Sequence, residues 1–147
     1  MRTDADRAVA AYARLIEIRS IAKPEGYSFR YYLPEEINEF DASPEFEPAT
    51  SRLTFPGSFA LAAYADSKLD ALATCGKENE CMYQIGVATS TDCRHHGLAK
   101  CLVAEISRYT YEISGIPYYS TWLTNIKSLM LAETVGYRYA WTEIYSM

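Results

Sequence analysis

The chain has 147 residues, of which 49% are hydrophobic, and this length and composition suit one compact domain rather than a disordered chain. Fourteen Lys and Arg side chains against nineteen Asp and Glu leave a formal charge of −5, which opposes binding to nucleic acid or anionic lipid. Neither a membrane-spanning apolar stretch nor a signal-peptide core is present. We therefore expect one cytoplasmic domain over residues 1–147, with no nucleic-acid or membrane partner.

The first 23 residues have the pattern of an amphipathic helix. Thr3 can cap it, with Asp6 in the reciprocal position. Four apolar residues then recur at helical spacing: Val9, Tyr12, Leu15 and Ile16. Pro24 ends the pattern, so we predict an extra N-terminal helix over residues 4–21.

A strand and a loop-rich segment follow. Residues 27–31 alternate between polar and apolar as a strand does, and Pro34 followed by Glu35 and Glu36 indicates the start of a second helix. Three prolines between residues 41 and 56 predict short helical pieces and loop.

Strands and helices alternate in the rest of the chain. Residues 58–64 and 69–74 are small and apolar on either side of a turn-rich tetrad, which predicts a β-hairpin. Five more elements are predicted in the order strand 82–89, helix 97–114, strand 116–123, helix 125–135 and strand 137–145. This order predicts an α/β (α+β layered) domain with a mixed, mostly antiparallel central sheet flanked by helices.

Metal binding has little support in the sequence. The four cysteines, at positions 75, 81, 93 and 101, have no C-x-x-C spacing, so we expect reduced thiols rather than a zinc site. His95 and His96 are adjacent but have no further His in the chain to complete a ligand set. We expect no metal cofactor.

The junction between the strand that ends at Thr89 and the helix that begins at Gly97 is a candidate phosphate site. A helix start has unpaired backbone N–H groups and the positive end of the helix dipole. Gly97 and Ala99 are small enough for a pyrophosphate to approach the backbone, and Arg94 adds a positive charge. Small residues at such a turn also suit a purely structural role.

Two motifs resemble those of the GNAT superfamily of acetyl-CoA-dependent N-acetyltransferases. Residues 94–99 match its Q/R-x-x-G-x-G/A pyrophosphate loop, and Asn125 followed by residues 136–137 matches its N…G-F/Y segment. Two motifs in the right order and spacing are more specific than either one. Four further stretches resemble the zwittermicin-A-resistance-type branch of this superfamily: residues 82–87, 116–121, 125–128 and 140–143.

The resemblance implies a GNAT-like acyl-CoA N-acyltransferase fold, with acetyl-CoA as cosubstrate and its pantetheine arm paired along the motif strand. It assigns cofactor binding to Val87, Ala88, Thr89, Arg94, His95, His96, Gly97, Leu98, Ala99, Asn125 and Ser128. Neutral imidazoles at His95 and His96 would make the phosphate cradle less positive at pH 7 than in acid. Asn125 also suits simple N-capping of the helix that follows it, and the two roles are compatible.

Direct attack of an amine on the thioester is the reaction that the resemblance implies. Glu78 and Glu80 are candidate general bases because they come just before the motif strand, although both also suit solvated loop positions. The superfamily often has a Tyr seven residues after the helix Asn as general acid, and Ala132 occupies that position here. Ser128 or solvent would then protonate the leaving thiolate.

The acceptor is a primary amine of a small molecule in this interpretation. Tyr83 and Gln84 are predicted to point to opposite faces of their strand, so one lines the substrate cleft while the other packs. Four aromatic residues can form a substrate wall or belong to the core: Tyr118, Tyr119, Trp122 and Trp141. Tyr119 is the substrate-binding candidate among them. Antibiotics, polyamines, amino acids and peptide N-termini all stay open as acceptors.

An alternative interpretation is a degenerate GNAT domain that acts as a CoA-binding or protein-interaction module without turnover. The missing Tyr favours it, as does the absence of the further strand that many relatives carry after residues 137–145. That strand is then expected at an open sheet edge, which can pair with another chain. We accordingly predict a two-fold homodimer, with this strand or the N-terminal helix at its interface.

Overall fold

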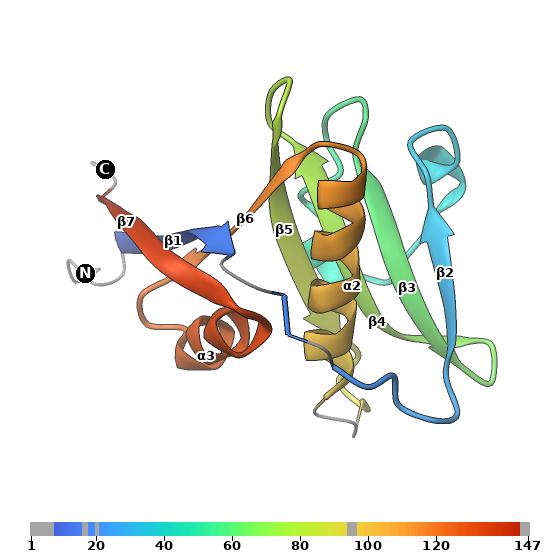
Figure 1. The fold of residues 1–147 in the computed structure, drawn as a ribbon. Coiled ribbons are helices and arrows are strands. Elements are labelled where there is room, and N and C mark those ends of the chain that lie inside the picture. Colours follow the sequence, from blue (N-terminus) through green and yellow to red (C-terminus); the bar gives the residue numbers. More distant parts are fainter. Residues whose placement is uncertain (1–7, 16–17, 20, 94–96, 145–147) are drawn as a thin grey trace.

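The computed structural model describes residues 8–15, 18–19, 21–93 and 97–144 (Figure 1). Within these residues, seven strands form one sheet in the order β2-β3-β4-β5-β6-β1-β7. The strands are β1 (Ala8–Leu15), β2 (Ser28–Tyr32), β3 (Phe59–Ala65), β4 (Lys68–Lys77), β5 (Met82–Thr89), β6 (Ile116–Trp122) and β7 (Tyr137–Ile144). The helices are α1 (Glu47–Thr50), α2 (Leu98–Glu112) and α3 (Ile126–Val135), with short 3-10 helices η2 (Ile37–Glu39) and η3 (Pro44–Phe46).

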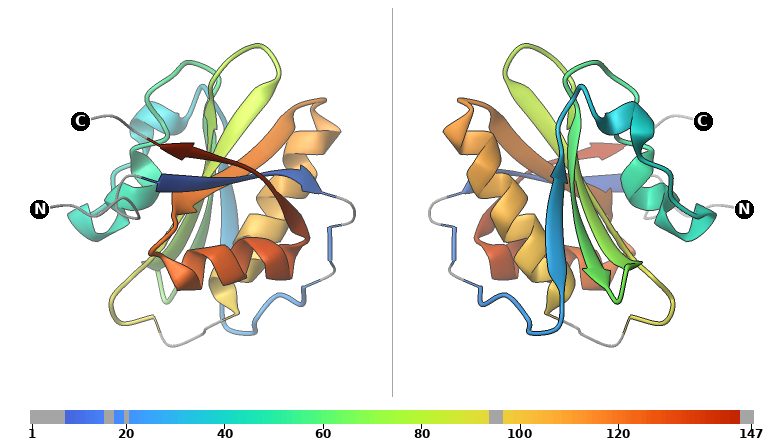
Figure 2. Two further views of the ribbon diagram at one scale, coloured as in Figure 1. Left: turned by 90° about the vertical axis from the view of Figure 1, so that its left-hand side faces the viewer. Right: turned by 90° about the vertical axis from the view of Figure 1, so that its right-hand side faces the viewer.

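The predicted layered α/β domain is confirmed. Strands β5 and β6 run parallel, whereas the other neighbouring pairs of the described sheet are antiparallel. Helix α2 connects the parallel pair, as a crossover must, and covers one face of β3, β4 and β5. The η3–α1 segment lies against the opposite face (Figure 2). None of the described helices is long and apolar enough to cross a membrane.

Alternation along β3 divides the core into two parts. Phe59 and Leu61 lie in the part beneath α2, whereas Ala60 and Ala62 lie in the part beneath α1. Helix α2 contributes fully buried residues at helical spacing: Leu98, Leu102 and Ile106. Because burying each such side chain is worth about 1.5–3 kcal/mol, α2 is held firmly beside the strand that precedes it.

The predicted N-terminal helix over residues 4–21 is wrong for the part that the structure describes. Residues 8–15 form β1, which lies antiparallel between β6 and β7 (Figure 2). Ala10, for example, is opposite Thr121 on one side and Thr142 on the other. A short apolar pattern is a weak helix signal, and two neighbouring strands offer this segment backbone partners along its length.

The other predicted elements before residue 75 agree more closely with the structure. The second helix predicted after Pro34 shrinks to a turn and η2, but residues 41–56 contain the expected short helical pieces. The predicted hairpin is confirmed as β3–β4. Its turn residues Asp66 and Ser67 have φ values of 49° and 66°, the left-handed conformation that a tight two-residue hairpin turn requires.

Strand β7 lies at an edge of the sheet, as predicted for residues 137–145. Tyr137, its first residue, is buried, but the side chains that follow are exposed. They include Tyr139, with 56% of its surface exposed, and Ile144, with 74%. This edge therefore presents apolar surface, and within the described part of the chain no strand pairs with its outer side.

Candidate active site

Strands β5 and β6 diverge halfway along their length. They pair from Met82 opposite Ile116 to Ile85 opposite Tyr119, and no later pairing is found among the described residues. Residues 86–89 of β5 continue to pair with β4 on their other side. Figure 1 shows that β6 runs away from β5. One edge of residues 86–89 therefore presents backbone N–H and C=O groups with which an extended ligand can pair as an added strand.

A cavity of about 530 Å³ opens along this edge and is called the edge cavity below. It is lined by six of the predicted cofactor-binding residues: Val87, Ala88, Thr89, Ala99, Asn125 and Ser128. Lys127 lines it too and brings a positive charge that the sequence pattern did not single out. Because Ala99 lies in the first turn of α2, the edge cavity reaches the positive end of a helix dipole.

The other predicted cofactor residues differ in their positions. Gly97 immediately precedes α2, and its carbonyl oxygen accepts from Cys101 N at 3.0 Å. Leu98 is fully buried, so only its backbone is suited to face a ligand. Arg94, His95 and His96 lie outside the described residues.

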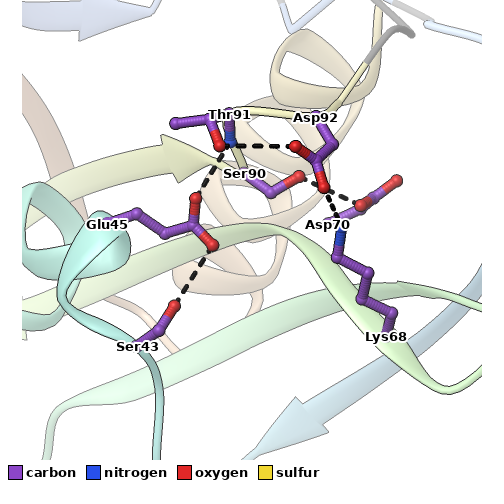
Figure 3. A network of polar contacts seen from close by, with 7 residues as sticks. All are labelled: Ser43, Glu45, Lys68, Asp70, Ser90, Thr91 and Asp92. Carbon is purple, nitrogen blue, oxygen red and sulfur yellow. Dashed lines mark hydrogen bonds and ion pairs between the residues drawn. The ribbon is translucent and has the colours of Figure 1, made fainter.

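The loop that follows β5 is fixed by polar contacts from neighbouring elements (Figure 3). Three pairs hold it, with the loop residue first: Ser90 with Asp70, Thr91 with Glu45, and Asp92 with Lys68. Thr91 N donates to Glu45 Oε2 at 3.0 Å, and this bond is the largest of the effects that lower the pKa of Glu45. The loop leading to the predicted phosphate motif is thus attached to both η3 and β4.

Asn125 caps α3, as simple N-capping predicted. Its Oδ1 accepts from Ser128 N at 3.2 Å. The Ser128 hydroxyl is in turn 2.9 Å from the hydroxyl of Tyr119. Burial raises the pKa of Tyr119, while its bond to Ser128 and the nearby Arg52 charge act in the opposite direction. The phenol is accordingly protonated at neutral pH.

A second cavity, of about 780 Å³, lies on the α1 side of the sheet and is called the acceptor cavity below. Its lining includes Glu47 and Arg52 near α1, Gln84 of β5, and Trp122 of β6. Three residues line both cavities: Val87, Asn125 and Ser128. The two cavities therefore adjoin where β5 and β6 diverge.

A polar network forms part of the wall of the acceptor cavity, with the amide of Gln84 at its centre. In the orientation that satisfies all of its neighbours, Gln84 Nε2 donates to Glu78 Oε1 at 2.6 Å. Its Oε1 accepts from Arg52 Nη1 at 3.2 Å and from Ser120 Oγ at 2.5 Å. Burial is the largest of the effects that raise the pKa of Tyr118, and the negative charge of Glu78 is the next largest. Glu78 is thus hydrogen-bonded to Gln84, which lines the cavity.

The predicted substrate-binding and base candidates differ in how they lie relative to the acceptor cavity. Tyr83 is 8% exposed and packs against Phe59, so it belongs to the core rather than to substrate binding. Gln84, on the opposite face of β5, takes the cavity position, as the alternation of side chains in a strand requires. Glu80 is exposed in the turn before β5 and makes no hydrogen bond or ion pair that the described residues reveal. Ala132, in place of the usual Tyr, is fully buried.

Sequence reasoning missed Arg52 and Glu47 because they lie in the proline-rich segment, far from either motif. Two strand glycines were a usable signal, since an isolated Gly in a strand often marks a close backbone approach. A Cβ atom on Gly76 would lie 2.2 Å from Arg52 O, and one on Gly86 would lie 2.7 Å from Arg52 Cγ. Both glycines therefore make room for Arg52.

The resemblance implied a motif strand whose exposed backbone can pair with the pantetheine arm, and residues 86–89 of β5 have such an exposed edge beside a cavity. The family profile described as GNAT acetyltransferase matches residues 57–145, more than half of the chain. The chain belongs to this family, whose members are acetyl-CoA-dependent acyltransferases. A search of curated proteins gives no significant match.

Solved structures of low sequence identity share the fold. A GCN5-related N-acetyltransferase-like protein from Streptococcus suis is 15% identical, with a TM-score of 0.70 over 95% of this chain. A GNAT-family acetyltransferase from Novosphingobium aromaticivorans is 16% identical, with a TM-score of 0.64 over 92%. This chain spans 61% of the length of each. An aminoglycoside acetyltransferase from a soil metagenome, 12% identical, has a TM-score of 0.55 over 75% of this chain and 87% of its own.

Proposed function

We propose that this protein is an N-acetyltransferase that moves an acetyl group from acetyl-CoA to a primary amine of a small molecule by direct attack on the thioester. The observation that carries the proposal is the meeting of the edge cavity and the acceptor cavity at Val87, Asn125 and Ser128. Two ligands bound in adjoining cavities are held close enough to react without a covalent enzyme intermediate.

Acetyl-CoA, when bound, supplies an acetyl group activated as a thioester. The described residues suit it because the backbone edge of residues 86–89 can pair with an extended amide-containing arm. Ala99 leaves the first turn of α2 open to an anionic group, and Lys127 offers a counter-charge. Backbone N–H groups on the same strand edge are fixed donors that can stabilise negative charge developing on an acyl oxygen.

Glu78 is the proposed general base. Its carboxylate contacts the Gln84 amide, which lines the acceptor cavity, whereas Glu80 makes no such contact. An ammonium group must lose a proton before it can attack a carbonyl carbon. In this proposal Glu78 accepts that proton through water beside Gln84, and its contact with the Gln84 amide supports the assignment.

Ser128 and Tyr119 form the proposed source of the proton that the leaving sulfur requires. The Ser128 hydroxyl lies where the two cavities meet, and the buried Tyr119 hydroxyl stands 2.9 Å behind it. Ser128 can donate its proton to the sulfur while it accepts one from Tyr119, and the phenol regains a proton from solvent through Ser128 once CoA has left. This pair stands in for the Tyr that Ala132 replaces.

A small-molecule acceptor is supported by two further observations. The stretches at residues 82–87 and 116–121 resemble the zwittermicin-A-resistance-type branch. The metagenomic neighbour, whose structures were solved with trehalose and with sisomicin, is an aminoglycoside acetyltransferase. The acceptor cavity of about 780 Å³ is of a size suited to small molecules.

The test combines calorimetric titration with acetyl-CoA and a thiol-release assay across a panel of amines. We expect binding of acetyl-CoA, and CoA release that depends on the amine. Gly97→Glu is expected to abolish binding while leaving the fold intact, because it places a carboxylate at the start of α2. Glu112→Gln, at the far end of the same helix, is the matched control.

Three outcomes separate the interpretations. Amine-dependent release of CoA supports the enzyme. Binding of acetyl-CoA without turnover of any amine contradicts it and favours a CoA-binding module. Binding by Gly97→Glu as tight as that of the unaltered protein would show that the cofactor site is misplaced.

A further inference from the structure

Arg52 lines the acceptor cavity, and neighbouring residues of the sheet hold its segment in place. The segment that ends at Arg52 is held against the sheet by Thr74 Oγ1, which donates to Ala49 O at 2.7 Å. Gly76 and Gly86 have no side chains to obstruct it, and a Cβ on either would overlap Arg52 atoms. Two adjacent strands thus leave room for one arginine that lines the cavity.

The guanidinium of Arg52 has no ion-pair partner among the described residues. Ion pairs within the described ranges are formed by Arg30, Lys68 and Arg108, and none involves Arg52. Its Nε is buried without a hydrogen-bond partner there, while Nη1 contacts only the neutral Gln84 amide among the interactions found. A partly desolvated cation without a counter-ion is costly, and an anionic ligand would relieve that cost.

Gln84 also keeps Arg52 apart from the nearest acid of the network. Its amide nitrogen contacts Glu78 and its amide oxygen contacts Arg52, so one amide group separates the carboxylate from the guanidinium. Glu47 lines the same cavity. The wall therefore offers sites of opposite charge a short distance apart, as a zwitterion with a nearby ammonium and carboxylate requires.

Taking the proposed function as given, we infer that the acceptor is an amino acid, whose carboxylate binds Arg52 while its ammonium lies toward Glu78. A guanidinium is suited to planar recognition of a carboxylate. A polycationic acceptor such as an aminoglycoside has no carboxylate for Arg52 to bind. A phosphate dianion would meet the charges of Glu47 and Glu78, so a singly charged carboxylate fits better.

The test compares matched acceptors that differ only in the carboxylate. The common amino acids with a primary amine are screened by thiol release, and each active one is measured beside its primary amide. We expect kcat/KM about 10- to 100-fold higher for the acid than for the amide, mainly through KM, as loss of one charge-assisted contact predicts. Arg52→Met is expected to bring this ratio near one, and Arg52→Lys to an intermediate value.

Arg30→Met is the control, because Arg30 is an exposed arginine on β2 that pairs with Glu36. It should keep the acid preference of the unaltered protein. Calorimetry with acetyl-CoA shows whether Arg52→Met is folded. Equal activity on acids and amides, or an acid preference that survives in Arg52→Met, would overturn the inference while leaving the acetyltransferase proposal intact.

If no amine is turned over, saturation-transfer NMR with the same acids and amides still measures whether they bind to the site. Binding of an amino acid that is lost with its amide and in Arg52→Met would support the carboxylate site even though the proposed transfer had failed. Equal binding of acid and amide, or no binding of either, would overturn it.

Discussion

Two tyrosine–serine pairs allow the role of a single hydroxyl to be measured. Tyr119 and Ser128 lie 2.9 Å apart where the two cavities meet. Tyr137 and Ser107 lie 2.7 Å apart in the buried core. The chemistry of the two contacts is the same, so any difference in their effect on turnover comes from position.

Ser128→Ala and Tyr119→Phe are each expected to lower kcat about 10- to 100-fold, because the leaving sulfur then lacks a nearby proton. Their effects should not add in the double variant, since each breaks the same relay. Tyr137→Phe and Ser107→Ala are the matched controls. Steady-state kinetics in which Tyr119→Phe and Tyr137→Phe behave alike would rule out the relay.

Glu78 and Glu80 form a second matched pair, two residues apart in one turn. Glu78→Gln is expected to reduce turnover more at pH 7 than at pH 9, because the amine loses its proton without help as pH rises. Glu80→Gln should have little effect at either pH, since Glu78 rather than Glu80 contacts Gln84 among the described residues. A pH–rate profile for both variants is the measurement. A loss for Glu78→Gln that is equal at every pH would contradict a base role.

Among the elements, the loop after β5 depends on contacts from parts of the chain that are distant in sequence. Glu45 precedes Thr91 by 46 residues, yet its carboxylate accepts the Thr91 backbone N–H. The conformation of this loop is thus coupled to the position of η3 (Figure 3).

Acid should release this contact. The bond to Thr91 lowers the pKa of Glu45 below its ordinary value of 4.5. A group whose pKa is lowered by folding contributes stability above its ordinary pKa, and that contribution disappears as pH falls through the folded value. NMR of the Thr91 amide should therefore show a titration with a midpoint below pH 4.5, absent in Glu45→Gln. The same titration in both proteins would refute the contact.

At the scale of the whole molecule, the edge strand β7 is the candidate for assembly. Among the described strands only β1 pairs with it, and its exposed apolar side chains include Tyr139, Trp141 and Ile144. A long exposed edge of this kind favours pairing with another strand. We propose that two copies pair through β7 in a two-fold dimer.

Light scattering at micromolar concentration should return twice the chain mass of 16.6 kDa. Tyr139→Lys combined with Ile144→Lys is expected to give the monomer and to leave acetyl-CoA binding unchanged, because charge on an edge opposes pairing. Tyr111→Lys changes an exposed aromatic residue on α2 and serves as the control. A monomer mass for the unaltered protein would contradict the dimer.

Local sequence patterns determined most of the elements after residue 58. Strand alternation, the Asp66-Ser67 turn and the Asn125 cap depend on neighbours in the chain, so they are readable from one sequence. The motif resemblance, rather than these patterns, named the cofactor-binding candidates, six of which line one cavity. Strand alternation also predicted correctly that Tyr83 and Gln84 face opposite ways.

Only the tertiary structure decided the rest. The segment over residues 8–15 has a helix-like apolar spacing. It is nevertheless a strand, because its backbone pairs with β6 on one side and β7 on the other. Which of Tyr83 and Gln84 reaches the cavity depends on which sheet face α2 covers. Arg52 enters the acceptor cavity because Gly76 and Gly86, on two other strands, leave it space. Contacts of this kind join residues far apart in sequence, and no local pattern encodes them.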